Sequence, residues 1–341
     1  MSAAGSEALG PFRVLLLGAT GTIGRATLGA LRARGHRVVC LGRRATAIEG
    51  AIEGAIEGAT EGATEGVEGR VVDLSDPTAI RQDGLRGERF DAVVSCLASR
   101  TGVPRDAWAV DHGMNAAVLR AARDAGVGRF VLLSALCVQK PRLEFQRAKL
   151  ALEAELAASG VGYLIVRPTA FFKSLSGQVE RVRRGKPYLL FGDGRLTACK
   201  PISDGDLAAY LADCLTDPSR WGRVLPIGGP GPAITPREQG EALFAMLGRA
   251  PRFRSVPVGM LDGIVGVLGA AARVVPSLGV KAELARIGRY YATESMLVWD
   301  AAAGRYDAGA TPATGTETLF GHYRALLGGR VVDDRGAHAV F

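Results

Sequence analysis

A glycine-rich turn near the start of the sequence constrains the fold of this chain more than any other feature. The nearly all-apolar run Phe12–Leu17 predicts a buried strand, and an Ala- and Leu-rich helical pattern follows it as far as Arg34. Gly18, Gly21 and Gly24 join the two in the spacing G-x-x-G-x-x-G. Glycine suits these positions because the turn is tight, the backbone must approach a pyrophosphate, and the helix must pack close to the strand. The turn therefore predicts a dinucleotide-binding site at a helix N-terminus.

The same alternation of strand and helix continues along the chain. Further buried strands are predicted at 37–41, 71–72, 92–96, 130–133, 163–166 and 224–227, and helical patterns cover 107–125 and 143–158. Nearly continuous apolar strands of this kind are covered by helices on both faces. We therefore expect an α/β fold with a doubly wound, parallel, Rossmann-type sheet and a smaller, mostly helical C-terminal part.

Two parts of the chain follow from this pattern. We expect residues 12–170 to form the dinucleotide-binding domain and 200–228 to return to it. Residues 171–199 and 229–329 are expected to form the substrate-binding part, because the βα alternation weakens after the last predicted strand of the first domain. Residues 330–341 are expected to be a loose tail.

Composition and charge exclude several classes of protein. The sequence contains no run of about 18 uncharged apolar residues, so we expect no membrane span. Five cysteines without a C-x-x-C spacing and four well-separated histidines indicate free thiols and no metal site. Those thiols, and a start that lacks the pattern of a secretory signal, indicate the cytoplasm. The net charge is +8, but no aromatic residue interleaves the basic run 181–186, so we expect no nucleic-acid partner.

Residues 47–69 form a low-complexity segment that repeats AIEG and ATEG. Glycine at every fourth position disfavours a helix, and the glutamates favour solvation. We therefore expect an expanded acidic loop between the second and third strands. A mobile flap near the adenosine end of a bound dinucleotide is the alternative.

Residues 256–275 form an apolar stretch that is interrupted by Asp262 and Arg273. The ten uncharged residues between these two are too few to span a bilayer. Three roles remain open for this segment: packing in the core, lining an apolar substrate cleft, or shallow contact with a membrane.

The end of the second strand indicates which dinucleotide binds. An acidic residue there would hold the ribose 2′-hydroxyl of NAD. The strand instead ends before Arg43 and Arg44, whose guanidinium groups suit a 2′-phosphate, so NADPH is the expected cofactor. The alternative is a pair of solvated surface arginines. Asp73, which closes the third strand, is a candidate for binding the adenine amino group.

This layout resembles the short-chain dehydrogenase/reductase superfamily in its atypical branch. The resemblance implies a serine at the end of the fifth strand and a Tyr-x-x-x-Lys motif on the next helix. Ser134 and Lys149 occupy these positions, but Phe145 replaces the tyrosine. Because phenylalanine has no proton to give, the superfamily's usual carbonyl chemistry is in doubt. The spacing still puts Phe145 and Lys149 on one helix face. Alternatively, Lys149 forms an exposed pair with Glu153, four residues on.

Longer strings carry a closer resemblance, which extends from about Val14 to Leu327. They include VSCLASR (94–100), LSALCVQKP (133–141), LEFQRAKL (143–150), VRPTAFFKSL (166–175), FGDG (191–194), CKPIS (199–203), LPIGGPG (225–231) and IGRYYA (287–292). Together these strings resemble the NADPH-dependent divinyl chlorophyllide a 8-vinyl reductases of chlorophyll and bacteriochlorophyll synthesis. The repeat at 47–69 is the main departure and touches none of the strings.

This resemblance implies hydride transfer from NADPH to the 8-vinyl group of divinyl chlorophyllide a or divinyl protochlorophyllide a. A missing tyrosine fits that reaction, because no carbonyl oxygen has to be protonated. We expect Lys149 to bind the nicotinamide ribose and to add positive potential there. The proton would come from Lys149 through a water, or from solvent. The expected catalytic positions are Lys149, Ser134 and Phe145. The expected cofactor-binding residues are Gly18, Thr20, Gly21, Thr22, Ile23, Gly24, Arg43, Arg44, Asp73, Ser95, Lys149, Pro168 and Thr169.

The substrate would be large, flat and apolar, with a propionate at one edge. Aromatic candidates for its ring faces are Phe171, Phe172, Tyr290 and Tyr291. Lys173, Arg286 and Arg289 are candidates for the propionate. Core packing or plain surface exposure is the alternative for each. The resemblance does not decide the oligomeric state, or whether the chain is also peripheral to the photosynthetic membrane.

Two other functions remain open. One is a dinucleotide-fold protein that senses the NADP(H) redox state without catalysis, which the missing tyrosine would fit. The other is a reductase of a different conjugated C=C bond. Ser134, Lys149 and the long reductase-like strings argue against the sensor.

Overall fold

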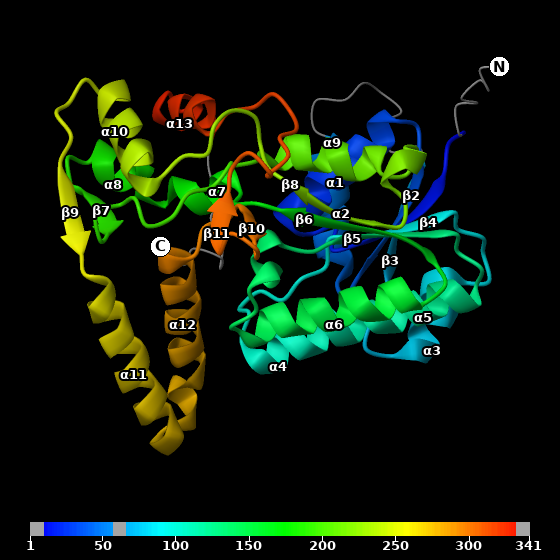
Figure 1. Cartoon of the computed structure of the whole chain (residues 1–341). Coiled ribbons are helices and arrows are strands. Elements are labelled where there is room, and N and C mark those ends of the chain that lie inside the picture. Colours follow the sequence, from blue (N-terminus) through cyan, green and yellow to red (C-terminus); the bar gives the residue numbers. More distant parts are fainter. Residues whose placement is uncertain (1–9, 57–65, 332–341) are drawn as a thin grey trace.

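Seven parallel strands form the central sheet of the chain. The computed structural model describes residues 10–56 and 66–331 (Figure 1). The strand order is β3-β2-β1-β4-β5-β6-β8, and every neighbouring pair is parallel. The strands are β1 (Arg13–Leu17), β2 (Arg37–Gly42), β3 (Val67–Val71), β4 (Ala92–Ser95), β5 (Arg129–Leu133), β6 (Gly162–Pro168) and β8 (Arg223–Ile227).

Helices cover both faces of this sheet, so the predicted doubly wound α/β class is confirmed. On one face lie α1 (Thr22–Ala33), α2 (Ala45–Ile56) and α9 (Asp204–Asp213), and on the other α5 (Asn115–Asp124) and α6 (Glu144–Ala158). Side chains alternate along each strand, so Val14 and Leu16 pack in one apolar cluster while Leu15 and Leu17 pack in the other. The core therefore lies in two layers, one on each side of the sheet.

The order of the strands reverses between β1 and β4, since β2 and β3 extend from one side of β1 and β5, β6 and β8 from the other side of β4. In open α/β sheets, ligands bind at the carboxyl ends of the strands beside such a switch point. The glycine-rich turn after β1 therefore lies where a dinucleotide site is expected.

A second group of elements packs beside the end of the sheet at which α7 (Phe172–Leu175) begins. Strand β7 (Tyr188–Phe191) pairs in parallel with β9 (Phe253–Val256), and β10 (Val298–Asp300) pairs antiparallel with β11 (Arg305–Asp307). Helices α8 (Val179–Arg183), α10 (Pro236–Met246) and α13 (Leu319–Leu327) share a separate apolar cluster with β7. Between these segments α9 and β8 return to the central sheet.

The expectation that residues 47–69 form a loop is wrong at both ends of that segment. Residues 45–56 are helical as α2, and β3 begins at Val67. The repeat places Ile48, Ala51 and Ile52 on one face of α2, where Ile48 and Ala51 are buried and Ile48 and Ile52 pack in the apolar cluster on this side of the sheet. Burial of these side chains outweighs the low helix propensity of glycine. Residues 57–65 lie outside the described residues, as does most of the expected tail at 330–341.

The apolar stretch at 256–275 does not pack in the core. It forms α11 (Val258–Val274), none of whose residues is buried. With α12 (Gly279–Thr293), α11 forms a helical hairpin that projects from the body of the molecule (Figure 1). Core packing, one of the three roles considered for this stretch, is therefore wrong. In the part of the chain that the structure describes, no helix is both long and apolar enough to cross a membrane.

Candidate active site

The turn between β1 and α1 brings backbone close to backbone. Gly18 has a φ of 77°, and a Cβ there would lie 2.7 Å from the carbonyl carbon of Cys96. A Cβ on Gly24 would lie 2.0 Å from the Gly18 oxygen. Only glycine fits either position, since atoms this close would clash. The turn is thus built for close approach of α1 to the strand ends.

The first turn of α1 leaves its backbone donors without a side-chain cap. Gly21 is the N-cap residue, it makes no side-chain cap bond, and no acidic residue lies in the first turn. Thr20, Gly21 and Thr22 are exposed, and Ile23 is half-buried. Uncapped N–H groups and the positive end of the helix dipole favour a bound anion. The described residues therefore fit the pyrophosphate of a dinucleotide.

Lys173 lies beside this helix start, although its sequence position suggested the substrate. Its ammonium group donates a 3.0 Å hydrogen bond to the Thr22 hydroxyl. Lys173 belongs to α7, so the second group of elements reaches across to the glycine-rich turn. An ammonium group at this place lies beside the helix N-terminus where the phosphates of a dinucleotide are expected.

Arg43, Arg44 and Asp73 lie at the same edge of the sheet, after the ends of β2 and β3. Both arginines are exposed. The Asp73 carboxylate accepts hydrogen bonds from the Ser75 hydroxyl and backbone N–H at 2.6 and 2.9 Å. These bonds, with the nearby charge of Arg43, hold the pKa of Asp73 below its usual value. The carboxylate and the Arg43 guanidinium are therefore neighbours at the place expected for the adenosine.

Ser95 occupies the end of β4, but its hydroxyl is used within the protein. The side chain is fully buried and donates a 2.5 Å hydrogen bond to the Asn115 side chain. It also accepts a bond from the backbone N–H of Leu97. The Asn115 amide in turn donates to the Leu97 carbonyl. This arrangement fixes the loop after β4, so Ser95 is placed to shape that loop.

Lys149 forms an ion pair that the sequence did not suggest. Its Nζ lies 2.8 Å from Oδ1 of Asp111, and the carboxyl side chain is 1% exposed. The Ser99 hydroxyl donates a 2.5 Å bond to the other oxygen of Asp111. Asp111 comes from a π-helical segment, Trp108–Met114, immediately before α5. The signal in the sequence that could have identified Asp111 is a lone carboxylate within the otherwise uncharged run 107–119.

Glu153, the partner considered for Lys149 from the sequence, is buried elsewhere. The Ser134 hydroxyl donates a hydrogen bond to its carboxylate, and Arg167 forms an ion pair with it. The exposed pair between Lys149 and Glu153 is therefore wrong. Ser134 follows β5 and Arg167 lies in β6, so Glu153 connects α6 to two strand ends.

Phe145 lies one turn before Lys149 on α6, and its side chain is 8% exposed. It belongs to an apolar cluster with Cys137, Ile287 and Tyr290, so α12 packs against it. Its ring also lies below Gly102, where a Cβ would meet Phe145 Cδ1 at 3.7 Å. The side chain therefore contributes an apolar wall at the place where the superfamily motif has a phenol.

Pro168 and Thr169 are buried at the end of β6. The Thr169 N–H donates to the Ile227 carbonyl, and its hydroxyl donates to the Lys200 carbonyl. The two phenylalanines that follow differ in burial. Phe171 is half-buried, whereas Phe172 is buried in the apolar cluster of the second group of elements.

The aromatic and basic candidates on α12 also differ in their burial and partners. The Tyr290 hydroxyl donates to the carbonyls of Cys137 and Lys140, and its side chain is 4% exposed. Tyr291 is half-buried, with its hydroxyl 3.7 Å from the Cys137 sulfur. Burial raises the pKa of the Tyr291 phenol well above its usual value. Arg289 forms an ion pair with Asp262 across the hairpin, and Arg286 pairs with Glu283.

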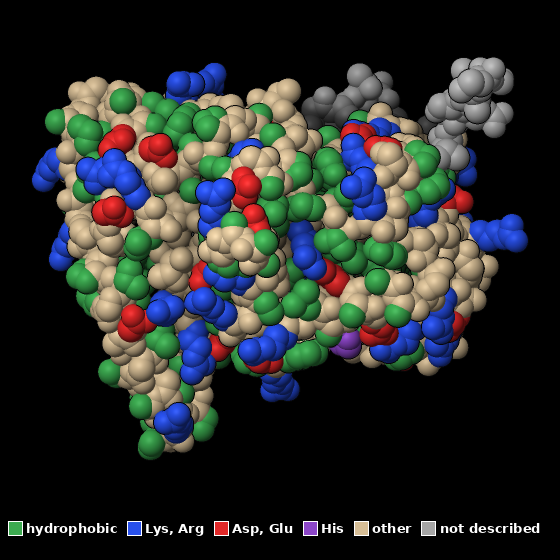
Figure 2. Space-filling view, in the orientation of Figure 1, with side chains coloured by type: hydrophobic (Ala, Val, Ile, Leu, Met, Phe, Trp, Pro, Cys, Tyr) green, Lys and Arg blue, Asp and Glu red, His purple; other side chains and the backbone are tan. Residues whose placement is uncertain are grey.

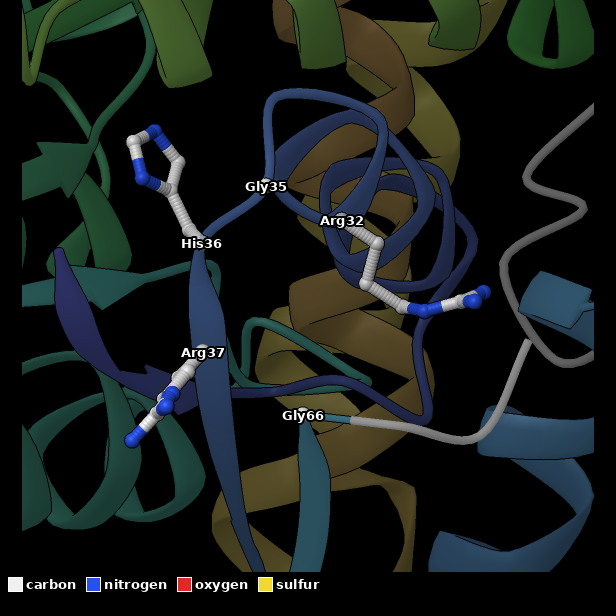
Figure 3. Close-up of a pocket in the computed structure, with 5 residues that line it drawn as sticks. All are labelled: Arg32, Gly35, His36, Arg37 and Gly66. Atoms are coloured by element: carbon white, nitrogen blue, oxygen red, sulfur yellow. The ribbon is translucent and has the colours of Figure 1, made fainter. Parts of the chain in front are cut away.

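A separate hollow, lined by Arg32, Gly35, His36, Arg37 and Gly66, lies at the opposite edge of the sheet (Figure 3). It is next to the first residue of β2, whereas the glycine-rich turn follows the last residue of β1. The three long side chains point away from one another. The His36 Nδ1 accepts a hydrogen bond from the Phe12 N–H. This hollow is therefore not part of the candidate active site.

Comparison with known proteins first defines the class of protein to which the chain belongs. Residues 18–218 match a family described as NAD(P)H-binding. An NADPH-dependent quinone oxidoreductase from Escherichia coli, solved with NADPH, has the same fold, with a TM-score of 0.66 and 18% identity over 92% of this chain and 99% of that one. The chain is thus an NAD(P)H-binding protein of the Rossmann type.

Closer relatives define the particular family. A chloroplastic divinyl chlorophyllide a 8-vinyl-reductase from Oryza sativa subsp. indica is 48% identical over 336 residues, covering 96% of this chain and 82% of that protein. The protein of the same name from Arabidopsis thaliana is 48% identical over 324 residues, covering 92% and 76%. The chain belongs to the divinyl chlorophyllide a 8-vinyl-reductase family.

Proposed function

We propose that this chain uses NADPH to reduce the 8-vinyl group of divinyl chlorophyllide a, or of divinyl protochlorophyllide a, to an ethyl group. The observation that carries this proposal is the pairing of Lys149 with Asp111 on the helix face where Phe145 replaces tyrosine. The Lys149 ammonium is present and oriented, whereas the tyrosine that would protonate a carbonyl oxygen is replaced by Phe145. Reduction of a vinyl group uses a positive charge near the reacting atoms but has no carbonyl oxygen to protonate. High identity to the named reductases over nearly the whole chain supports the same reaction.

In this proposal the glycine-rich turn binds the pyrophosphate, and Arg43 and Arg44 bind the 2′-phosphate. The cofactor, when bound, supplies hydride to the vinyl group. Lys149 holds the nicotinamide ribose and places a positive charge near the reacting atoms, where it stabilises negative charge that develops on the substrate. Asp111 positions Lys149 for this role. Lys149, through a water, or solvent supplies the proton to the other vinyl carbon.

Ser134 and Phe145 have supporting roles in this proposal. The Ser134 hydroxyl is engaged by Glu153, so Ser134 acts as a positioning residue for the end of β5. Phe145 excludes water from the side of Lys149 that faces α12. Removal of water strengthens the interaction of Lys149 with developing charge.

For the pigment we propose Phe171 and Tyr291 as the aromatic walls, because both rings are half-buried. Phe172 and Tyr290 are buried, so we propose packing roles for them rather than contact with the pigment. Arg289 remains our candidate for the propionate, which would have to compete with Asp262. We assign residues 171–199 and 229–329 to this substrate-binding part.

We further propose that the chain works in the cytoplasm. Its five cysteines are all free in the structure, and four of them are buried. Free thiols are typical of a reducing compartment.

The function is tested by anaerobic incubation of the purified protein with NADPH and each divinyl pigment separately. We expect a product heavier by two hydrogens, detected by chromatography and mass spectrometry, and little product with NADH. The faster pigment identifies the preferred substrate. If NADPH binds but neither pigment is converted, the result favours the redox sensor or a reductase of another C=C bond.

The position of Lys173 gives a separate prediction. Lys173→Ala should raise the KM for NADPH by about 10-fold, since a hydrogen bond from a charged group to phosphate contributes roughly 1.5–3 kcal/mol. The KM for the pigment should change little. Steady-state kinetics with each substrate varied in turn measures both values. A rise confined to the pigment KM would return Lys173 to the propionate.

A further inference from the structure

Helix α11 is apolar on both of its faces, although among residues 10–56 and 66–331 its main neighbour is α12, which covers one face. Val258, Leu261, Val265 and Leu268 are half-buried on the side that packs against α12. On the other side, Met260 is 50% exposed, Ile264 40%, Val267 70% and Val274 83%. A helix that is hydrophobic all round is normally buried or in contact with lipid. The outer face of α11 is thus an exposed apolar patch of the kind that marks an interaction site.

The charges of the hairpin are arranged in a second, independent pattern. Arg273 and Lys281 flank its far end, where α11 passes into α12. In the described ranges 10–56 and 66–331, neither cation has a carboxylate within ion-pair distance. The only acidic residues of the two helices, Asp262 and Glu283, pair with Arg289 and Arg286. The far end of the hairpin therefore combines apolar side chains with unneutralised positive charge (Figures 1 and 2).

This combination distinguishes between two occupants of the outer face. A second copy that docked through the same face would bring its own Arg273 and Lys281, and the two carboxylates of its hairpin already pair with Arg289 and Arg286. Lipid phosphates at an anionic bilayer surface would complement Arg273 and Lys281, while the acyl boundary would cover the apolar side chains. The length of α11, about 25 Å for 17 residues, suits a helix lying in the interface more than one crossing it.

We propose that the α11–α12 hairpin docks the protein on an anionic lipid bilayer, with the outer face of α11 inserted at the headgroup level and Arg273 and Lys281 bound to lipid phosphates. This inference goes beyond the proposed function and does not depend on it. Docking would also bring α12, which carries Tyr291, close to the bilayer.

Flotation with vesicles tests the proposal. The full chain should float with vesicles of phosphatidylcholine mixed with phosphatidylglycerol, and much less with phosphatidylcholine alone. Val267→Glu combined with Val274→Glu should reduce the bound fraction at least 10-fold. Arg273→Ala should weaken binding to the mixed vesicles about 5-fold. Because all three side chains are exposed, NADPH binding and the melting temperature should not change.

A matched control makes the same change of charge elsewhere. Val224→Glu introduces a carboxylate at a valine of β8 that is 41% exposed, and it should leave vesicle binding nearly unchanged. Equal losses in both valine variants, or no binding of the unmodified chain to the mixed vesicles, would overturn the proposal. Sedimentation of the vesicle-free protein would overturn it in favour of a second copy, if the unmodified chain dimerises and the α11 variant does not.

Discussion

Lys149→Met should lower the turnover of the divinyl pigment by about 100-fold or more. Removal of a preorganised positive group or donor at a reacting centre typically costs this much. The structure adds a second effect, because the buried Asp111 carboxylate would lose its ion-pair partner and keep only neutral donors such as the Ser99 hydroxyl. Breaking a buried ion pair by removing one partner costs about 3–5 kcal/mol of stability. The variant should therefore be both inactive and less stable.

A double variant separates these two effects. Lys149→Met with Asp111→Asn removes both charges, so its melting temperature should rise above that of the single variant while turnover stays low. Lys149→Arg retains the charge and serves as the conservative comparison. The measurements are kcat, NADPH binding by fluorescence, and thermal unfolding. Recovery of turnover in the double variant would show that Lys149 is needed for stability and not for the reaction.

Replacement of both Arg43 and Arg44 by alanine should raise the KM for NADPH by at least about 100-fold and leave the KM for NADH almost unchanged. The guanidinium groups follow β2 at the edge of the sheet that carries the glycine-rich turn, and both are exposed. Charge-assisted hydrogen bonds to a phosphate contribute roughly 1.5–3 kcal/mol each, and NADH has no 2′-phosphate to lose them. Kinetics with each cofactor varied separately measures the change in preference.

A matched control removes the same two charges at a distance from the site. Arg183 and Arg184 both pair with Glu180 on α8 and are exposed. Their replacement by alanine should raise both KM values only slightly, because it acts through the net charge alone. If the variant of Arg43 and Arg44 instead raises both KM values by the same factor, the two arginines do not bind the 2′-phosphate.

Local sequence patterns predicted the central sheet and the glycine-rich turn because both depend on neighbouring residues. Strand β1, for example, follows from five consecutive mostly apolar residues, and the turn follows from three glycines within seven positions. The helix α2 was missed because its intrinsic propensity is poor. Gly42 and Gly69, on the neighbouring strands β2 and β3, leave the space that Ile48 fills. A local sequence pattern does not reveal this contact between separate elements.

The partners of the candidate site residues were not predictable in the same way. Lys149 pairs with Asp111 rather than with Glu153 on its own helix, and Lys173 reaches Thr22, which lies 151 residues earlier. Such pairs form between elements that only packing brings together. The exposed face of α11 belongs to the same class, because burial is a property of the neighbours of a helix and not of its own sequence.

By itself, the sequence determined that this chain forms a parallel dinucleotide-binding sheet, that Phe145 replaces a tyrosine, and that the long strings match one family of reductases. These features are carried by the order of residues along the chain. Only the tertiary structure decided that Asp111 holds Lys149, that Glu153 holds Ser134 and that α11 projects from the body. The physical reason is that charge pairing and burial depend on distances in space, which the folded arrangement of remote elements sets.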